Sequence, residues 1–331
     1  MKIGLIGTRG HVHQVFERWN TLSDVAIAGL SAGTDADSPD SLVELCAKHN
    51  QAPTVFPDYR KMLDDVKPDV AVVMGPFEAH AKMCCEAFGR GIHVFCEKPA
   101  AITMADLAIL KQSYARSKCH FSAMMSLRYQ PAFYTAHGLV NGGAIGKVRL
   151  INAQKSYKLG TRPDYYKRRE TYGGTIPWVG IHGIDILYWF AHQRFLSVHA
   201  VQSSLHNLGH GDLEMSALCQ FVMQDEILAS VTMDYYRPAT APSHGDDRVR
   251  VVGTDGVIEV RHGKVLLINS SAQGESSVTA ACDRTIFADF IGQIRGGASS
   301  LVSAEDVFNV TEACLLARES ADGKRMLEFP A

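Results

Sequence analysis

Short apolar runs alternate with amphipathic stretches through the first 125 residues. Continuous apolar runs are typical of strands buried on both faces of a parallel sheet, and they predict strands at residues 2–6, 25–30, 70–74, 91–95 and 120–125. Helical patterns lie between them, up to residue 19, at residues 38–50 and 59–65, up to residue 88, and at residues 103–117. This alternation predicts βαβ units and a doubly wound parallel sheet of the Rossmann type.

The pattern changes after residue 126. Strand-like stretches follow at residues 148–156, 197–204, 213–220, 227–235, 248–252 and 265–268. Hairpin-type turns such as Thr254-Asp255-Gly256 join several of them, which favours a mostly antiparallel sheet. We therefore predict an α/β protein with a Rossmann domain at residues 1–125 and a second α/β domain at residues 126–331. The closing helix, residues 304–323, could pack back on the first domain.

Composition excludes several classes of partner. The 33 basic and 35 acidic residues give a net charge of -2, so no basic field is available to hold nucleic acid or an anionic membrane. Eight scattered cysteines without Cys-x-x-Cys spacing indicate reduced thiols instead of a zinc site or disulfide framework. A strand begins at once and no apolar run reaches membrane-spanning length, so we expect a cytoplasmic protein with a small-molecule substrate.

A glycine turn follows the first strand. The segment Gly7-Thr8-Arg9-Gly10-His11-Val12 leads into a helical stretch, the order in which dinucleotide folds hold a pyrophosphate. The match to the G-x-G-x-x-G motif is imperfect, because Arg9 and Val12 occupy the positions of its second and third glycines. The second strand ends in Ser31 without an early acid, and Asp35 comes late. The cofactor could be NAD or NADP, and this arrangement slightly favours NADP, with Arg9 binding the 2′-phosphate. The alternative is that Arg9 points to solvent.

Lys98 lies just after the strand predicted at residues 91–95, at its carboxyl end. Pro99 holds Lys98 in an extended bend, where open α/β sheets keep their ligand crevice. A cation there could bind a phosphate or stabilise an alkoxide; the alternative is a surface lysine after a strand.

His182 lies on a helix expected from residue 177 to 190. Trp178, His182 and Asp185 share one face of it by their spacing, and a Gly173-Gly174 turn lies just upstream. His182 is either a core histidine or a general base that takes a proton from an alcohol. We expect Lys98 and His182, one from each domain, to meet where a nicotinamide would lie. A second histidine motif, His206-x-x-x-His210-x-Asp212, has metal-like spacing, but it sits among asparagine and glycines and we interpret it as a polar loop without metal.

Taken together, these motifs resemble the Gfo/Idh/MocA oxidoreductase family over almost the whole chain. The resemblance rests on Glu97-Lys98-Pro99, the glycine turn and Gly173-Gly174…His182-x-x-Asp185. It extends to Gly75-Pro76…His80, to Arg128-Tyr129-x-Pro131 and to the closing helix with Glu319-Ser320.

The resemblance implies a hydride transfer between NAD(P) and a carbinol carbon of a sugar, inositol or similar polyol. It also implies an open sheet in the second domain that forms homodimers or homotetramers. By carry-over, Lys98 and His182 would be catalytic, with Asp185 beside them, and substrate would contact Lys98, Tyr157, Trp178 and His182. The residues expected to line the cofactor are Gly7, Thr8, Arg9, Gly10, His11, Val12, Ser31, Gly75, Pro76, His80, Glu97, Lys98 and Arg128.

Two positions depart from the family pattern. Trp178 occupies the place of an aspartate four residues before the histidine, and Phe77 replaces an asparagine. His182 would then work alone, or Asp185 or Tyr157 would substitute, or hydride chemistry would be lost. The leading hypothesis is a sugar or polyol dehydrogenase; the alternatives are a non-catalytic nucleotide sensor and a redox-neutral glycoside cleavage through a transient keto sugar.

Overall fold

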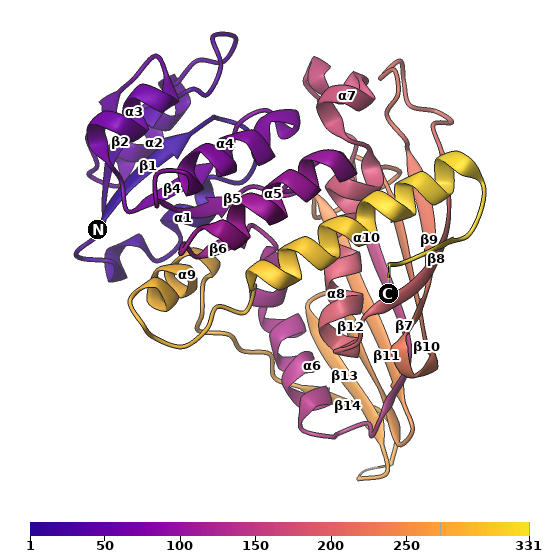
Figure 1. Cartoon of the computed structure of the whole chain (residues 1–331). Coiled ribbons are helices and arrows are strands. Elements are labelled where there is room, and N and C mark those ends of the chain that lie inside the picture. Colours follow the sequence, from indigo (N-terminus) through magenta and orange to yellow (C-terminus); the bar gives the residue numbers. More distant parts are fainter. Residues whose placement is uncertain (272, 331) are drawn as a thin grey trace. The chain divides into compact units, whose positions relative to one another are not determined.

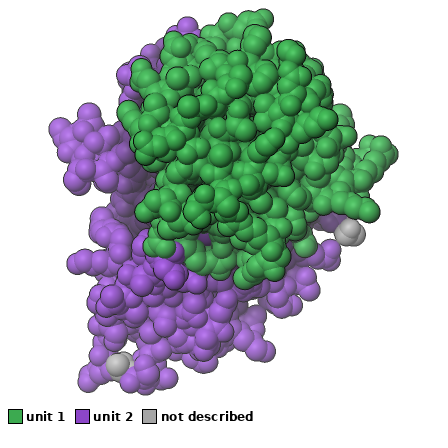
Figure 2. All heavy atoms as spheres, turned by 90° about the vertical axis from the view of Figure 1, so that its left-hand side faces the viewer, with its two compact units in different colours: residues 1–124, 284–311 green, residues 125–283, 312–331 purple. Residues whose placement is uncertain are grey.

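The structure is a computed structural model that describes residues 1–271 and 273–330 (Figure 1). It divides the chain into two compact units, coloured in Figure 2. Unit 1 comprises Met1–Met124 and Arg284–Thr311, and unit 2 comprises Met125–Asp283 and Glu312–Ala331. The first boundary falls one residue from the position expected from sequence. Residues 284–311, which include the start of the closing helix, belong to unit 1.

Unit 1 contains a six-stranded parallel sheet in the order β3-β2-β1-β4-β5-β6. Its strands are β1 (Lys2–Ile6), β2 (Ala26–Ser31), β3 (Thr54–Val55), β4 (Val70–Val73), β5 (His93–Cys96) and β6 (Phe121–Ala123). Every residue of β4 is buried, because helices cover both faces of a doubly wound sheet. The predicted Rossmann sheet is confirmed.

Helices of unit 1 lie between these strands along the chain, except α9, which belongs to the later segment at residues 284–311. They are α1 (His13–Phe16), α2 (Asp40–Lys48), α3 (Tyr59–Val66), α4 (His80–Phe88), α5 (Met104–Arg116) and α9 (Ile286–Ile294), with 3-10 turns at Trp19–Thr21 and Phe77–Ala79. The expected helix up to residue 19 stops at Phe16, and Arg18 takes a left-handed backbone conformation (φ 55°) that an α-helix cannot continue through.

Aromatic packing explains why the late segment belongs to unit 1. Phe287 of α9 lies 6.5 Å from Trp19 and 5.3 Å from Phe95, measured between ring centroids, and Phe290 lies 5.6 Å from Phe95. Burial of such rings removes large apolar areas from water. Residues near the end of the chain thus complete the core around β5, the strand that leads to Lys98.

Unit 2 is built on a nine-stranded sheet in the order β14-β13-β12-β11-β7-β10-β9-β8-β15. Only the β7–β10 pair is parallel among its strand pairs in the described residues, so the expected antiparallel character is confirmed. Its strands are β7 (Val148–Tyr157), β8 (Phe195–Ser203), β9 (Ser216–Met223), β10 (Ile227–Asp234), β11 (Gly245–Gly253), β12 (Gly256–Arg261), β13 (Lys264–Asn269), β14 (Ser276–Val278) and β15 (Leu327–Glu328).

Unit 2 also contains several helices and helical turns. These are α6 (Pro131–Asn141), α7 (Arg169–Tyr172), a π-helical turn (Ile176–Gly180) and α8 (Ile181–Ala191), with 3-10 turns at Ser126–Tyr129, Asp164–Lys167 and Gln224–Glu226. Helix α8 packs on β7 and β10, and α6 packs on β12 and β13 (Figure 1). The unit boundary falls within α10 (Ala304–Gly323). No helix among the described residues is long and apolar enough to cross a membrane.

The opposite face of the sheet exposes apolar side chains. Val201, Val222 and Leu228 come from the neighbouring strands β8, β9 and β10 and are 47%, 38% and 54% exposed. Leu228 lies opposite Val222 in the strand register. Strand alternation places these residues on the side away from α8, since their sequence neighbours are buried.

Candidate active site

The glycine turn after β1 is pressed against the ends of β4 and β5. Gly7 and Gly10 have φ angles of 94° and 93°, which L side chains rarely adopt. A Cβ on Gly7 would lie 2.2 Å from the Met74 carbonyl oxygen, and one on Gly10 would lie 2.1 Å from Glu97 Oε2. The turn therefore needs both glycines. Three more of the residues expected to line the cofactor lie in turns of unit 1. Thr8 and Val12 follow β1, and Pro76 follows β4.

Glu97 holds this turn and the lysine segment together. One carboxylate oxygen, Oε2, accepts the His11 backbone N–H at 2.5 Å and lies 2.8 Å from His11 Nδ1, while Oε1 accepts the Lys98 N–H at 2.9 Å. Glu97 is fully buried. Burial alone would raise its pKa, but the charge and hydrogen bonds of His11 and the charge of Lys98 outweigh burial and lower it. We call this arrangement of Gly10, His11, Glu97 and Lys98 the Glu97 bracket.

Lys98 is the second residue after β5 and is almost completely buried. His80 ties its segment to the turn after β4, since His80 Nδ1 lies 2.8 Å from the Pro99 carbonyl oxygen and Nε2 lies 3.0 Å from the Gly75 carbonyl oxygen. Burial lowers the pKa of His80. Both ring nitrogens face protein carbonyls, so His80 positions the two turns. Its expected contact with the cofactor stays a prediction.

Arg9 is paired with an acid that the sequence reasoning did not credit. Its guanidinium donates to Asp37 through Nε at 3.1 Å and through Nη2, and Thr34 Oγ1 also donates to Asp37 at 3.1 Å. Ser31 accepts the Gly7 N–H on its carbonyl. A guanidinium already neutralised by a carboxylate is a weak attractor for a 2′-phosphate, so the structure gives no support to the tilt toward NADP.

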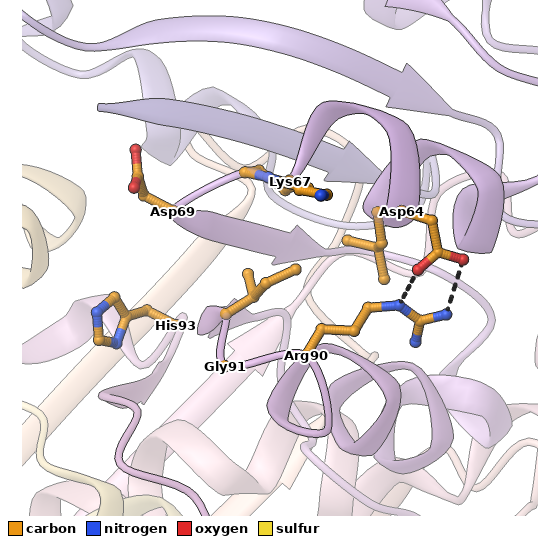
Figure 3. A pocket seen from close by; sticks show the side chains of 9 residues that line it. Asp64, Lys67, Asp69, Arg90, Gly91 and His93 are labelled. Atoms are coloured by element: carbon orange, nitrogen blue, oxygen red, sulfur yellow. Dashed lines mark hydrogen bonds and ion pairs between the residues drawn. The ribbon is translucent and has the colours of Figure 1, made fainter.

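A pocket of about 460 Å³ in unit 1 lies away from these turns (Figure 3). Asp69 and His93, at the starts of β4 and β5, line it, and the Arg90–Asp64 ion pair closes one side. It is therefore at the amino-terminal edge of the sheet. Ligands of open α/β sheets bind at the carboxyl edge, so we assign no cofactor role to this pocket.

In unit 2, helix α8 rests directly on the sheet. A Cβ on Gly183 would lie 2.5 Å from Val231 of β10, so glycine allows the close approach. His182 precedes Gly183 and is 6% exposed, and Trp178 lies about one turn earlier in the π-helical turn, also 6% exposed. Single π-helical turns are frequent at functional sites. The sequence predicted one regular helix from residue 177, whereas the structure has this π-helical turn before α8.

Asp185, expected beside the catalytic histidine, is paired with Arg128. The Arg128 guanidinium donates to the Asp185 carboxylate through Nε at 3.0 Å and through Nη2 at 2.5 Å. Both side chains are buried. Burying two charges is tolerated only with such geometry. The pair joins the start of unit 2 to α8. The expected roles, Arg128 at the cofactor and Asp185 at the reacting hydroxyl, stay predictions.

Lys155 is a buried cation that sequence reasoning missed. On β7 it follows Ile151 and Ala153 on the inward face, and its Nζ lies 2.6 Å from Asp247 and 4.9 Å from the centre of the Tyr157 ring. Burial alone would lower the pKa of Lys155, but Tyr157 and Asp247 outweigh burial and raise it. A lysine at an inward position of an alternating strand was the signal in the sequence.

Aromatic side chains from separate segments of unit 2 also pack together. Tyr172 and Tyr235 share a hydrogen bond between their hydroxyls at 2.8 Å, and Tyr172 also reaches Thr175 at 3.1 Å. Burial raises the pKa of Tyr172 and of Tyr235, so both stay protonated. Tyr166 lies with its ring centre 5.9 Å from Trp178. Such a cluster has no sequence motif, because only the fold brings its segments together.

The histidine motif with metal-like spacing forms a hydrogen-bonded loop. His210 Nδ1 lies 2.7 Å from the Asn207 carbonyl, and the Asp212 carboxylate accepts the Arg169 N–H at 3.1 Å. In residues 1–271 and 273–330, no group of three or more histidine, cysteine, aspartate or glutamate side chains is arranged to hold a metal ion.

Curated relatives share moderate identity with this chain. Inositol 2-dehydrogenase of Salmonella typhimurium is 25% identical over 207 residues, 61% of this chain and 57% of that enzyme. The uncharacterized oxidoreductase YrbE of Bacillus subtilis is 25% identical over 222 residues, 67% of this chain and 63% of that protein. The chain thus matches less than two thirds of the length of these relatives.

Solved structures match over nearly the whole chain. A Thermotoga maritima structure, described provisionally as an oxidoreductase, is 42% identical with a TM-score of 0.95, covering 99% of this chain and 100% of that one. Levoglucosan dehydrogenase in complex with NADH and levoglucosan shares the fold with a TM-score of 0.84 at 18% identity, covering 100% of both chains.

Family models cover both units. Residues 1–124 match the oxidoreductase family model with an NAD-binding Rossmann fold, and residues 133–259 match the GFO/IDH/MocA C-terminal domain. The first range contains the Glu97 bracket and the second contains His182. On the strength of these matches, the chain belongs to the GFO/IDH/MocA family of oxidoreductases with an NAD-binding Rossmann domain.

Proposed function

We propose that this protein is an NAD(H)-dependent dehydrogenase that acts on a carbinol carbon of a sugar or cyclic polyol. The observation that carries the proposal is the Glu97 bracket, in which one buried carboxylate binds the glycine turn and the Lys98 N–H. The residues suited to the cofactor phosphates and the lysine suited to the reacting hydroxyl are thereby held in one rigid piece. The inositol and levoglucosan dehydrogenase names among the relatives support the substrate class.

The residues of unit 1 fit a dinucleotide. Gly7 and Gly10 allow the backbone to approach a pyrophosphate, since a Cβ at either position would collide with unit 1 itself. When bound, the nicotinamide accepts or returns the hydride. We infer a preference for NAD(H) over NADP(H), because Asp37 neutralises Arg9, the cation that would otherwise attract a 2′-phosphate.

Two side chains would assist proton transfer from the substrate hydroxyl. Lys98, cationic, would donate a hydrogen bond to the reacting hydroxyl and stabilise the alkoxide as the proton leaves. His182 would accept that proton in oxidation and return it in reduction. The Arg128–Asp185 pair would fix α8, and with it the position of His182.

A titration with NADH and NADPH, followed by a panel of polyols and sugars, tests the function. We expect NADH to bind at least about tenfold more tightly than NADPH and reduced nicotinamide to form with one or more polyols. Lys98→Met should retain NADH binding and lower kcat/KM by about 10²-fold to 10³-fold. The matched control is Lys82→Met, an exposed lysine of α4. Full activity of Lys98→Met would refute the role of this lysine.

A non-catalytic nucleotide sensor is the second candidate. It is favoured by Trp178 in place of the family's aspartate and by the Arg128–Asp185 pair, which engages one of the two side chains that could replace that aspartate. Tight NADH binding with no turnover across a broad panel would select this alternative.

A further inference from the structure

Arg162 stands out in unit 2 because it is half-buried without a carboxylate partner. Its guanidinium carbon lies 4.9 Å from the centre of the Tyr235 ring and 5.3 Å from that of Tyr166. Nη2 donates to the Lys158 carbonyl at 3.3 Å, and Nε is buried with no acceptor in the described protein. An unsatisfied buried donor is costly, so a guanidinium held in this way is suited to an anionic ligand.

Asp247 and Glu214, which share the neighbours His244 and Tyr235 with Arg162, are already paired with other cations. Asp247 pairs with Lys155 at 2.6 Å, and Glu214 forms an ion pair with Arg169. Lys158 donates through Nζ only to backbone carbonyls, those of Ala239 and Ala241. Across residues 1–271 and 273–330, Arg162 and Lys158 thus leave two positive charges without a carboxylate.

His244 reports the positive potential of this region. Its ring lies 5.1 Å from that of Tyr157. The pKa of His244 is lowered, first by burial and then by the charges of Arg162 and Lys158, with Asp247 acting in the opposite direction. A neutral imidazole next to these cations keeps the region able to attract an anion.

Arg162 is also connected to the helix face that bears His182. Tyr166, beneath the guanidinium, lies edge-on to Trp178, and Trp178 precedes His182 by about one turn. An anion on Arg162 and a sugar ring that reacts beside His182 would therefore belong to one molecule.

We propose that Arg162, supported by Lys158, is a specificity residue that binds the carboxylate of a sugar acid, a uronate or an aldonate. A planar carboxylate matches a guanidinium through charge-assisted hydrogen bonds. This assignment names the substrate class of the dehydrogenase and rests on that proposed function. The residue acts in binding and has no part in hydride or proton transfer.

The test measures binding in the presence of saturating NADH, so it does not depend on turnover. The acidic probes are D-glucuronate, D-galacturonate and D-gluconate, and their neutral counterparts are D-glucose, D-galactose and D-glucitol. D-glucose 6-phosphate tests whether the site prefers a phosphate to a carboxylate. Calorimetry should give at least one acid a Kd about 10-fold to 100-fold lower than its neutral counterpart. Arg162→Gln should remove that difference, Arg162→Lys should keep part of it, and neutral ligands should change less than about threefold.

Arg149→Gln is the matched control. Arg149 is a β7 arginine whose Nη1 donates to the Asp225 carbonyl, and its replacement should leave the preference unchanged. NADH binding and thermal melting establish that each variant is folded. Equal binding of acids and neutral sugars, or a preference that survives Arg162→Gln, overturns the proposal; tighter binding of the phosphate overturns the carboxylate assignment. If acids bind through Arg162 but no hydride transfer occurs, the dehydrogenase proposal fails and the anion site stands.

Discussion

Replacing Glu97 with glutamine tests the Glu97 bracket directly. Both carboxylate oxygens accept backbone N–H groups, from His11 at 2.5 Å and from Lys98 at 2.9 Å. Glutamine has one carbonyl oxygen and one amide NH₂, so one of the two N–H donors would face another donor. Loss of one hydrogen bond to a charged group lowers the free energy of unfolding by about 1.5–3 kcal/mol. A buried N–H left without an acceptor lowers it further. We expect Glu97→Gln to lower the free energy of unfolding by about 2–4 kcal/mol.

The stability difference between wild type and Glu97→Gln should depend on pH in a defined direction. The pKa of Glu97 is lowered in the folded protein, because His11 and Lys98 outweigh the effect of burial. Stabilisation by a carboxylate whose folded pKa is depressed is fully present above its unfolded pKa, about 4.3, and disappears as pH falls through the folded pKa. The difference between wild type and Glu97→Gln should therefore be constant near neutral pH and shrink below about pH 4.3.

The assay is urea unfolding at several pH values, combined with NADH titration. Because the chain has two units, unfolding is followed by NADH binding, which reports unit 1, as well as by far-UV circular dichroism. We expect weaker NADH binding in the variant, since the His11 N–H loses its fixed acceptor. Glu44→Gln, an exposed position of α2, is the control. A Glu97→Gln protein with wild-type stability and NADH affinity would refute the reasoning.

Three further substitutions test other parts of the structure. Gly10→Ala should abolish NADH binding, because its Cβ would lie 2.1 Å from Glu97 Oε2 and its φ is 93°; unchanged affinity in the titration would contradict this. Asp185→Asn should destabilise the protein by about 3–5 kcal/mol, measured by denaturation, since it leaves Arg128 as a buried charge without its carboxylate. Leu228→Asp should dissociate a homodimer or homotetramer formed through the exposed face of β8, β9 and β10, which light scattering would detect; a wild-type monomer would contradict the expectation.

Fold class was predictable because hydrophobic periodicity is a local property. The apolar run of β4 and the alternation in β7 both specify how many faces of a strand are buried, and this distinguishes a parallel from an antiparallel sheet. Chain-end segments were harder to assign. Phe287 lies far along the chain from Trp19 and Phe95, and no local pattern indicates that it completes their core.

The sequence by itself determined the Rossmann domain, the glycine turn and the position of Lys98, because each depends on neighbouring residues and on the conformational limits of glycine and proline. Only the tertiary structure decided the partners of charged side chains. Asp185 pairs with Arg128 and Arg9 with Asp37, while Arg162 rests on tyrosine rings without a carboxylate. Charge pairing depends on distances across the fold, and residue spacing along the chain does not encode those distances.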